Sequence, residues 1–520
     1  MSSSQTDDAG GQGPDTPGHS GGTADRGDPR QRRTPILDGL LLYRERDYVP
    51  FHMPGHKRGR GAPPRLREAL GAALDVDLPL TPGFEDTRQR AGRLGAAEEL
   101  AAQAWNADRA FFLTNGSSGG LHTLVLALAP PGSVVVAPRN AHVALTDGLI
   151  LSGAMPIYLE PEIDSEWGVA LNVPPQRFRD ALATHPEARA VFVSSPSYNG
   201  CCAHIEPIVT AAHAAGATVA VDQAWGAHLH FCSALPAGAL EQGADAMVTS
   251  VHKLTGGVSQ ASLIAAQGER LDLDRLAAVV AMLRSTSMLV QILASIDATR
   301  MQMVTEGEEL WQRALELAAS ARSRLARVPG LRCMDAAVTE HRSVADLDLT
   351  RLTVSAADLG WAGYELEWEL RERYRIAVES ADAIGIVMNV TYADTSETLD
   401  RLVAALTAIA AEGPRSGATR ADRAALQLTL PPFSRLLMTP RAAFFATTRT
   451  VPLRSCVGEV SAEVVTPYPP GVPVLGPGEK ISSEIVAFLE DFKRRGLRVH
   501  GPHDPGLDTM RVVERPLEDD

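Results

Sequence analysis

The sequence predicts an α/β protein whose largest domain is built on a mostly parallel sheet. Short apolar runs alternate with Ala- and Leu-rich helical segments through the first half of the chain. This alternation is typical of parallel strands that carry helices on both faces. The 520 residues are 45% hydrophobic and 22% charged, a composition typical of folded globular proteins with roughly two to four domains at this length.

The first part of the chain is divided by composition. Residues 1–33 are largely Gly, Ser, Asp, Pro and Arg. They offer little to bury, so we expect a disordered tail. Residues 34–105 are expected to form an N-terminal segment that ends in a helix over Ala96–Trp105.

Six candidate strands follow, each a short run rich in apolar and β-branched residues. They are Ala110–Leu113, Ser133–Ala137, Met155–Leu159, Ala190–Ser194, Thr218–Val221 and Ala246–Thr249. Helical segments between them include residues 120–129 and 207–215. Ligands of such sheets bind at the carboxyl ends of the strands, so we expect the functional site at that edge.

The second half of the chain predicts two smaller domains. A long helix over Glu306–Val328 has its apolar side chains along one face. The strands Arg351–Ser355 and Ile384–Val390 flank a helical stretch at 364–374, and a Gly–Pro–Arg–Ser–Gly run at 413–417 is a candidate linker. The expected domains are therefore residues 34–105, 106–330, 331–413 and 418–520.

The charge and the cysteine content exclude several classes of partner. The formal net charge is −14 at pH 7, whereas nucleic acids and anionic membranes are bound through basic surfaces. No apolar stretch approaches the roughly 18 residues that span a bilayer, and no signal-peptide pattern is present. The five cysteines show neither a disulfide framework nor the spacing of metal ligands. They therefore favour a cytoplasmic location and a protein without a metal site.

The first predicted strand ends in a candidate anion-binding loop. Residues 114–120 read TNGSSGG and lead directly into a helix. Backbone N–H groups at a helix N-terminus, together with serine hydroxyls, can bind a phosphate. A tight turn with a serine cap explains the same residues, so the loop alone does not decide between the two.

Two further strands end in residues of complementary chemistry. Asp222 follows the fifth candidate strand, and His252 and Lys253 follow the sixth. Pyridoxal phosphate requires a lysine that forms the Schiff base, an aspartate that keeps the ring nitrogen protonated, and a phosphate cradle. We expect Gly256 and Gly257 to leave room for this cofactor. The sequence therefore predicts a pyridoxal-phosphate enzyme with a small-molecule substrate.

Residues 248–262, VTSVHKLTGGVSQAS, resemble the cofactor attachment site of the bacterial Orn/Lys/Arg decarboxylases. Further blocks agree in the same order, including FHMPGHKRG, PRNAHVAL, SPSYNG and TPYPPGVPVLGPGE. The resemblance covers about residues 35–495. It implies an aminotransferase-like (PLP fold type I) major domain over 106–330, a small α/β domain and a C-terminal α+β decarboxylase domain, in the compact form without an N-terminal wing domain.

The resemblance also implies the reaction and the roles of individual residues. The reaction is decarboxylation of a basic amino acid (arginine, lysine or ornithine) to an amine and CO2, as in polyamine biosynthesis. The implied catalytic residues are Lys253, His142, Asp222 and His252. The implied cofactor-binding residues are Lys253, Gly116, Ser117, Ser118, His142, Asp222, Ala224, Ser250, His252 and Thr286. Because Thr286 lies in a segment that reaches the neighbouring subunit's cofactor in the family, a homodimer with shared active sites is implied.

Several positions depart from the family pattern. His142 is followed by Val143 and Ala144 where the family has lysine and serine, and Asn199 replaces the second tyrosine of a Tyr–Tyr–Gly block. These departures leave open which amino acid is the substrate. A basic substrate needs an acidic partner, and Glu85, Asp86 and Glu463 lie in segments that could reach the site. Solvated surface charge is the interpretation that we favour for these three residues.

Two other functions fit the same residues. An aminotransferase, or a lyase that acts at Cα or Cβ, would use the same cofactor. A carboxylate-binding arginine would then be expected in the small domain, where the candidates are Arg351, Arg371, Arg373 and Arg375. A non-catalytic regulator on a decarboxylase scaffold would be consistent with the departures at residues 143, 144 and 199.

Overall fold

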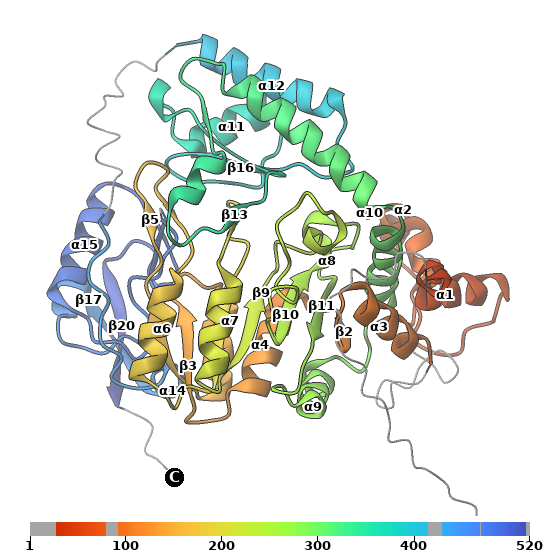
Figure 1. Ribbon diagram of the computed structural model, residues 1–520, viewed down its shortest axis with the longest axis horizontal. Coiled ribbons are helices and arrows are strands. Elements are labelled where there is room, and N and C mark those ends of the chain that lie inside the picture. The colour runs from red at the N-terminus through yellow and green to blue at the C-terminus, as the bar shows by residue number, and fades with distance from the viewer. Residues whose placement is uncertain (1–27, 80–91, 414–428, 469, 516–520) are drawn as a thin grey trace, which may run out of the picture.

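A seven-stranded sheet forms the centre of the molecule (Figure 1). The computed structural model describes residues 28–79, 92–413, 429–468 and 470–515. The strand order is β2-β11-β10-β9-β7-β3-β4. The strands are β2 (Arg109–Leu113), β3 (Val134–Pro138), β4 (Met155–Leu159), β7 (Ala190–Ser194), β9 (Thr218–Asp222), β10 (Ala246–Ser250) and β11 (Ser262–Ala266).

The sheet is mostly parallel, as predicted. Only β11 runs antiparallel to its neighbours, β10 and β2, and the other pairs are parallel. The six predicted strands correspond to β2, β3, β4, β7, β9 and β10. Strand β11 is not among the predicted strands, because its sequence SLIAA is rich in residues of low β-propensity and follows a polar loop.

Alternate side chains of the strands face two separate cores, because successive side chains point to opposite faces of a sheet. Val136 and Val191 pack in the cluster that includes α6 (Pro175–Thr184) and α7 (Ile205–Ala214). Val135 and Phe192 pack in the cluster on the opposite face. The helices of that face are α4 (Gly116–Leu128), α5 (Val143–Ser152) and α9 (Leu273–Leu283). Figure 1 shows α6 and α7 in front of the sheet and α4 behind it.

The long helix α10 (Val290–Leu325) leads from the sheet to a small domain. It begins at Val290, whereas the sequence predicted a start at Glu306. The prediction missed the first turns because they are apolar on several faces and therefore show no amphipathic stripe. Ile292, Leu293 and Ile296 in these turns are all buried. The sheet of the small domain contains β12 (Arg332–Cys333), β14 (Arg351–Ser355), β16 (Ile386–Asn389) and β15 (Ser380–Ala381). Its helices are α11 (Gly363–Tyr374) and α12 (Ser396–Ala411).

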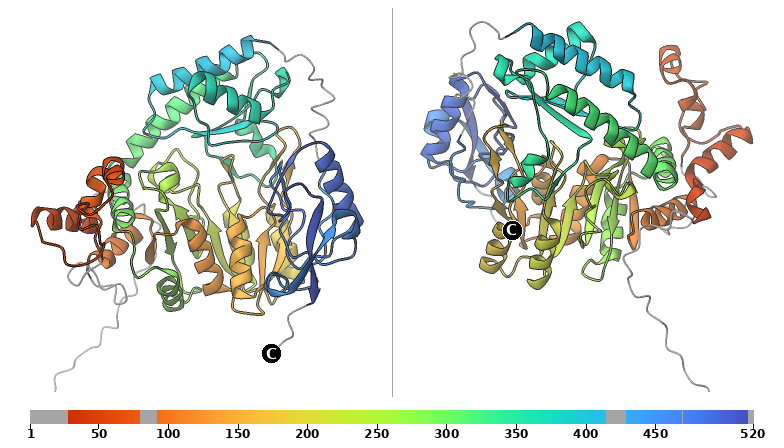
Figure 2. Two further views of the ribbon diagram at one scale, coloured as in Figure 1. Left: turned by 180° about the vertical axis from the view of Figure 1, so that it is seen from behind. Right: turned by 45° about the horizontal axis from the view of Figure 1, so that its top comes forward.

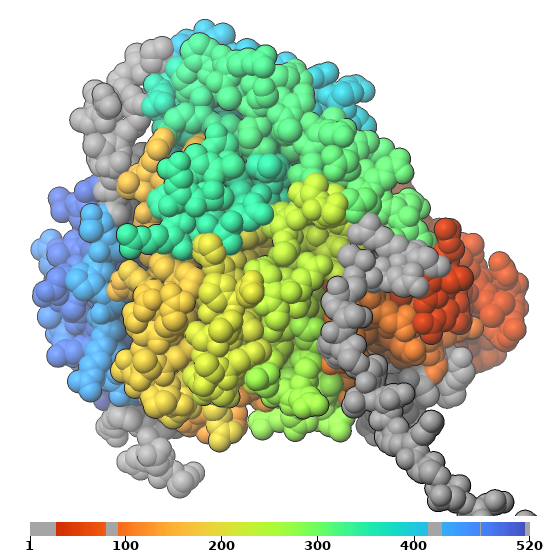
Figure 3. Space-filling view, in the orientation of Figure 1, coloured from red at the N-terminus to blue at the C-terminus, as the bar shows by residue number. Residues whose placement is uncertain are grey.

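The C-terminal domain pairs strands that are distant in sequence. Strand β17 (Thr447–Pro452) pairs with β20 (Thr509–Arg515), and β18 (Thr466–Tyr468) with β19 (Arg498–His500). The helices are α14 (Pro440–Phe445), which packs on α5, and α15 (Ser483–Arg494). Figure 3 shows this domain, in blue, beside the sheet domain, with the small domain across the top.

The N-terminal segment projects from the opposite side of the molecule (Figure 2). Its elements are η1 (Pro29–Arg32), α1 (Pro35–Glu45), α2 (Pro64–Leu70), η2 (Gly71–Val76) and α3 (Gly92–Ala104). The Arg300 guanidinium, buried in α10, donates to the carbonyls of Gln31 and Arg33. Residues 28–33 are therefore ordered, and the predicted disordered tail is wrong for this part; residues 1–27 lie outside the described residues.

Several short elements complete the fold. They are β5 (Ile163–Asp164), β6 (Val169–Ala170), β8 (Cys201–Cys202), η3 (Leu229–Phe231), α8 (Val251–Leu254), η4 (Ala336–Glu340), β13 (Asp346–Leu347), η5 (Ala357–Leu359) and η6 (Leu453–Ser455). In the part of the chain that the structure describes, no helix combines the length and the apolar character that crossing a membrane requires.

Candidate active site

A cavity of about 1110 Å³ lies at the carboxyl ends of the parallel strands and is lined by all three folded domains. Its position is the one expected from the sheet topology. Of the predicted cofactor-binding residues, all but Thr286 line the cavity. These are Gly116, Ser117, Ser118, His142, Asp222, Ala224, Ser250, His252 and Lys253.

The loop between β2 and α4 forms one end of the cavity. Gly116 has a φ of +72°, which favours glycine, and its N–H donates to the Gln260 carbonyl at 3.1 Å. The Ser117 and Ser250 hydroxyls lie 2.7 Å apart. The residue before α4 is Asn115, whose side chain makes no capping bond. The interpretation as a serine-capped turn is therefore wrong, and the N–H groups of Ser117 and Ser118 in the first turn can bind an anion.

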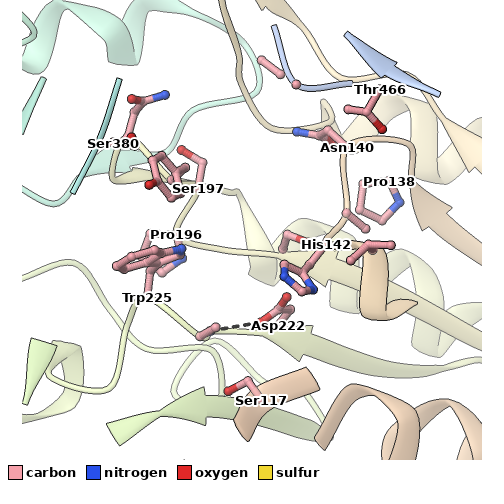
Figure 4. Close-up of a pocket in the computed structure, with 18 of the residues that line it drawn as sticks. Ser117, Pro138, Asn140, His142, Pro196, Ser197, Asp222, Trp225, Ser380 and Thr466 are labelled. Carbon is pink, nitrogen blue, oxygen red and sulfur yellow. Dashed lines mark hydrogen bonds between the residues drawn. The ribbon is translucent and has the colours of Figure 1, made fainter. Parts of the chain in front are cut away.

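Asp222 lies at the end of β9, next to the His142 ring (Figure 4). Its Oδ1 accepts a hydrogen bond from the Ala224 N–H at 3.1 Å. Burial raises the pKa of Asp222, and the nearby Lys253 and His142 lower it. The His142 Nδ1 accepts from the Ala144 N–H at 3.2 Å, which places the ring proton of neutral His142 on Nε2.

Lys253 lies in the single-turn helix α8, directly after β10. Its Nζ is 3.9 Å from the centroid of the Trp225 ring, and the Arg351 Cζ is 4.0 Å from the same centroid. Burial lowers the pKa of Lys253; Asp222 raises it, and Arg351 lowers it further. The surroundings thus favour the neutral amine, which is the form that attacks a carbonyl carbon.

His252 and Thr286 have different surroundings. The His252 Nδ1 donates to the Ala261 carbonyl at 2.8 Å, so the ring is held against β11. Thr286 is exposed in the loop between α9 and α10, outside the cavity of its own chain.

The expectation that Gly256 and Gly257 leave room for the cofactor is wrong, because neither lines the cavity. A Cβ at Gly256 would lie 3.0 Å from the Tyr392 hydroxyl, and one at Gly257 would lie 2.9 Å from the Ala261 Cβ. These glycines permit close packing of the loop after α8.

The acidic candidates do not line the cavity within the described residues. Glu463 is buried in the C-terminal domain, where its carboxylate accepts the N–H groups of His503 and Arg511. Glu463 therefore does not reach the cavity, and the favoured interpretation as solvated surface charge is wrong for this residue. Glu85 and Asp86 lie outside the described residues.

None of the four candidate arginines lines the cavity either. Arg351 is buried and donates to the Tyr198 carbonyl at 2.8 Å. Arg371 and Arg373 form surface ion pairs with glutamates of the small domain, and Arg375 is exposed.

Sequence reasoning missed several residues that line the cavity. Trp225 of the sheet domain could have been noticed, because it follows Asp222 at a strand end. The small and C-terminal domains contribute residues that carry no local signal: Tyr364, Ser380, Asp382, Thr466, Tyr468, Arg498 and His500. Val143 and Asn199, two of the departures from the family pattern, also line the cavity.

Comparisons with known proteins agree with this arrangement. The family models "Orn/Lys/Arg decarboxylase, major domain" and "Orn/Lys/Arg decarboxylase, C-terminal domain" match residues 34–368 and 424–506. The arginine decarboxylase of Bacillus subtilis is 37% identical over 93% of this chain and 98% of its own length. The arginine decarboxylase of Halalkalibacterium halodurans is 36% identical, with the same coverage.

Solved structures share the fold. Lysine decarboxylase A from Pseudomonas aeruginosa superposes with a TM-score of 0.81 at 22% identity, over 94% of this chain and 81% of that chain. The constitutive lysine decarboxylase of Escherichia coli gives a TM-score of 0.80 at 20% identity, over 93% and 82%. The predicted fold class is confirmed, and so is the predicted reaction class, decarboxylation of a basic amino acid. The chain belongs to the Orn/Lys/Arg decarboxylase family.

Proposed function

We propose that this protein is a pyridoxal-phosphate-dependent arginine decarboxylase that converts arginine to agmatine and CO2. The observation that carries the proposal is the convergence of Lys253, Asp222, His142 and the Ser117–Ser250 pair on one cavity. Arginine is the substrate named for the two bacterial relatives at 36–37% identity.

The residues of the cavity fit pyridoxal phosphate. The N-terminus of α4 and the Ser117–Ser250 hydroxyl pair suit the phosphate, because they offer several hydrogen-bond donors and no carboxylate. Asp222 suits the ring nitrogen, and Lys253 suits the covalent attachment. When bound, the cofactor supplies a protonated ring that accepts the electron pair left at Cα by the departing CO2.

The protein's own residues hold this chemistry in place. Asp222 is partly buried beside His142 and Lys253, so its negative charge is available to a protonated ring nitrogen in the cavity. Ala224 is a small residue in the cavity wall and leaves space for a planar ring. Lys253 is the amine that would return a proton to Cα, because it lines the cavity and has a lowered pKa.

Shared active sites follow as part of the same proposal. Thr286 is exposed and lies outside its own cavity, which is consistent with a contact to the cofactor phosphate of a second subunit. We therefore propose a homodimer. A cytoplasmic location is proposed from the reduced state expected of the five cysteines, four of which are buried.

The alternatives lose support from the cavity. A carboxylate-binding arginine from the small domain, as proposed for an aminotransferase, has no candidate among the lining residues. A regulator that does not bind the cofactor would not need the residues that we propose for cofactor attachment, for the phosphate and for the ring nitrogen.

The proposal is tested by product analysis. Purified protein with pyridoxal phosphate is incubated with arginine, lysine and ornithine, and CO2 and amine are measured. Agmatine and CO2 from arginine are expected, and Lys253→Ala should lose both these products and the visible absorbance of the bound cofactor. Lys493→Ala, a half-exposed lysine of α15, is the control. Keto acid without CO2 would indicate an aminotransferase, and a colourless protein would indicate a regulator.

A further inference from the structure

The cavity wall contains a carboxylate that is not among the predicted cofactor-binding residues. Among the described residues that line it, the carboxylates are Asp222 and Asp382. Asp222 lies at the end of β9 in the sheet domain and is assigned to the cofactor ring. Asp382 comes from the small domain, directly after β15, on a wall that none of the predicted cofactor residues supplies.

The backbone fixes the orientation of the Asp382 carboxylate. Its Oδ1 accepts hydrogen bonds from the N–H groups of Ile384 at 2.7 Å and Gly385 at 2.8 Å. Within the described chain, the other oxygen, Oδ2, has no hydrogen bond and no ion-pair partner. The carboxylate is therefore held by one oxygen, which leaves the other oxygen free to accept a hydrogen bond from a ligand in the cavity that Asp382 lines.

The surroundings of Asp382 suit a cation. The Asp382 carbonyl accepts the Tyr364 N–H at 3.1 Å, and Tyr364 also lines the cavity. The guanidinium of Arg498 lies over the Tyr364 ring, with its Cζ 4.7 Å from the centroid, and forms no ion pair with Asp382. Burial raises the pKa of Asp382, so a neighbouring cation would stabilise the charged carboxylate.

We propose that the Asp382 carboxylate binds the positively charged side chain of the substrate and so selects basic amino acids. This inference rests on the proposed function, because it assumes that the α-carbon of the substrate is held near Lys253. A charged hydrogen bond to a partly buried carboxylate favours a guanidinium or ammonium group over a neutral side chain of similar length.

Glu379 provides a matched control. It lies on the other side of β15, is exposed, accepts from the Asn389 Nδ2 at 3.0 Å and does not line the cavity. Asp382→Asn keeps an oxygen that can accept both backbone N–H groups, so the turn is retained while the charge is lost. Glu379→Gln removes a charge of the same sign from the same segment.

The experiment measures binding as well as turnover. Dissociation constants of arginine, lysine and norleucine, whose side chain is neutral, are obtained from the change in cofactor absorbance; steady-state KM and kcat follow from CO2 release. In Asp382→Asn, affinity for arginine and lysine should fall about 10- to 100-fold, while norleucine binding and the absorbance of the unliganded enzyme stay unchanged. Glu379 also raises the pKa of Lys253, so Glu379→Gln is judged by the ratio of arginine affinity to norleucine affinity, which should stay near that of the wild type.

The outcomes separate the two proposals. The role of Asp382 is refuted if Asp382→Asn binds arginine as tightly as the wild type does. It is also refuted if the affinity for norleucine falls by the same factor as the affinity for arginine. Both results would stand even when the wild type decarboxylates arginine. The role of Asp382 is refuted as well if the preference for arginine and lysine over norleucine is lost in Glu379→Gln and kept in Asp382→Asn. If the wild type decarboxylates lysine and not arginine, the proposed substrate fails, while weaker lysine binding by Asp382→Asn would still support the inference.

Discussion

The buried pair Arg139–Glu479 attaches the C-terminal domain to the sheet domain. Arg139 follows β3 and is 4% exposed, and Glu479 is 2% exposed. The Arg139 Nη2 donates to Glu479 Oε2 at 2.7 Å, a second bond joins Nη1 to Oε1, and Nε donates to the Pro473 carbonyl at 2.8 Å. Because Pro473 lines the cavity, this contact also positions part of the cavity wall.

Removal of one partner should be costly. In Arg139→Met, the Glu479 carboxylate stays buried and keeps only the 2.8 Å bond from the Gly476 N–H. Breaking such a pair costs about 3–5 kcal/mol, whereas replacing both partners by apolar side chains of similar size is often neutral. We therefore expect the double variant Arg139→Met/Glu479→Met to be more stable than either single variant.

Hydrogen exchange followed by mass spectrometry measures this cost by region. A loss of 3–5 kcal/mol corresponds to a fall in protection of about 100- to 5,000-fold. We expect this fall in C-terminal peptides, such as those that cover α15 and β20, and a smaller one in β7 and β9. If the costs of the two single variants simply add in the double variant, the pair carries no coupling energy and the reasoning is refuted.

Two further predictions concern the proposed cofactor site, and a third concerns the packing of α4 on the sheet. Ser250→Ala removes the hydroxyl bonded to Ser117, so the dissociation constant of pyridoxal phosphate in an absorbance titration should rise about 2- to 10-fold; an unchanged value contradicts a phosphate role. Because burial lowers the pKa of Lys253, its amine stays neutral to a lower pH than an ordinary lysine amine. As the pH is lowered, the rate of cofactor attachment to Lys253 should therefore decline at a lower pH than the rate of attachment to Nα-acetyllysine amide. Equal midpoint pH values of the two rate profiles would count against this prediction. Gly120→Ala brings a methyl group against Val248 and should cost about 1–3 kcal/mol in urea unfolding; Gly55→Ala, with free space around it, is the control and should cost clearly less.

The parts of the fold that were predictable are those with strong local patterns. Met155–Leu159, Ala190–Ser194 and Arg351–Ser355 are strands with the predicted bounds, because apolar and β-branched runs are bounded there by polar or turn residues. Strand β11 was not predicted, since its alanines favour a strand only through pairing with β10 and β2. Pairing partners distant in sequence leave no periodic signal in the strand itself.

The site was predictable where strand ends carry chemistry. Lys253, Asp222 and the loop at 114–120 each follow a strand, so the topology alone brings them to one edge. Asp382 and Arg498 were not predictable, because the packing of the small and C-terminal domains decides whether they reach the cavity. Glu463 illustrates the converse, since the sequence allows it to reach the substrate, whereas its carboxylate is bound by backbone N–H groups of its own domain.

The residues of the cavity wall are spread from Asn115 to Gly501, and this spread has a consequence for biosynthesis. Domains fold largely in the order in which the ribosome releases them. Lys253 and the proposed phosphate cradle belong to the sheet domain, which leaves the ribosome before the C-terminal domain that contributes Tyr468, Arg498 and His500. A nascent chain can therefore form the proposed cofactor pocket before its outer wall exists, and the cavity closes only once the C-terminal domain has packed against the sheet domain.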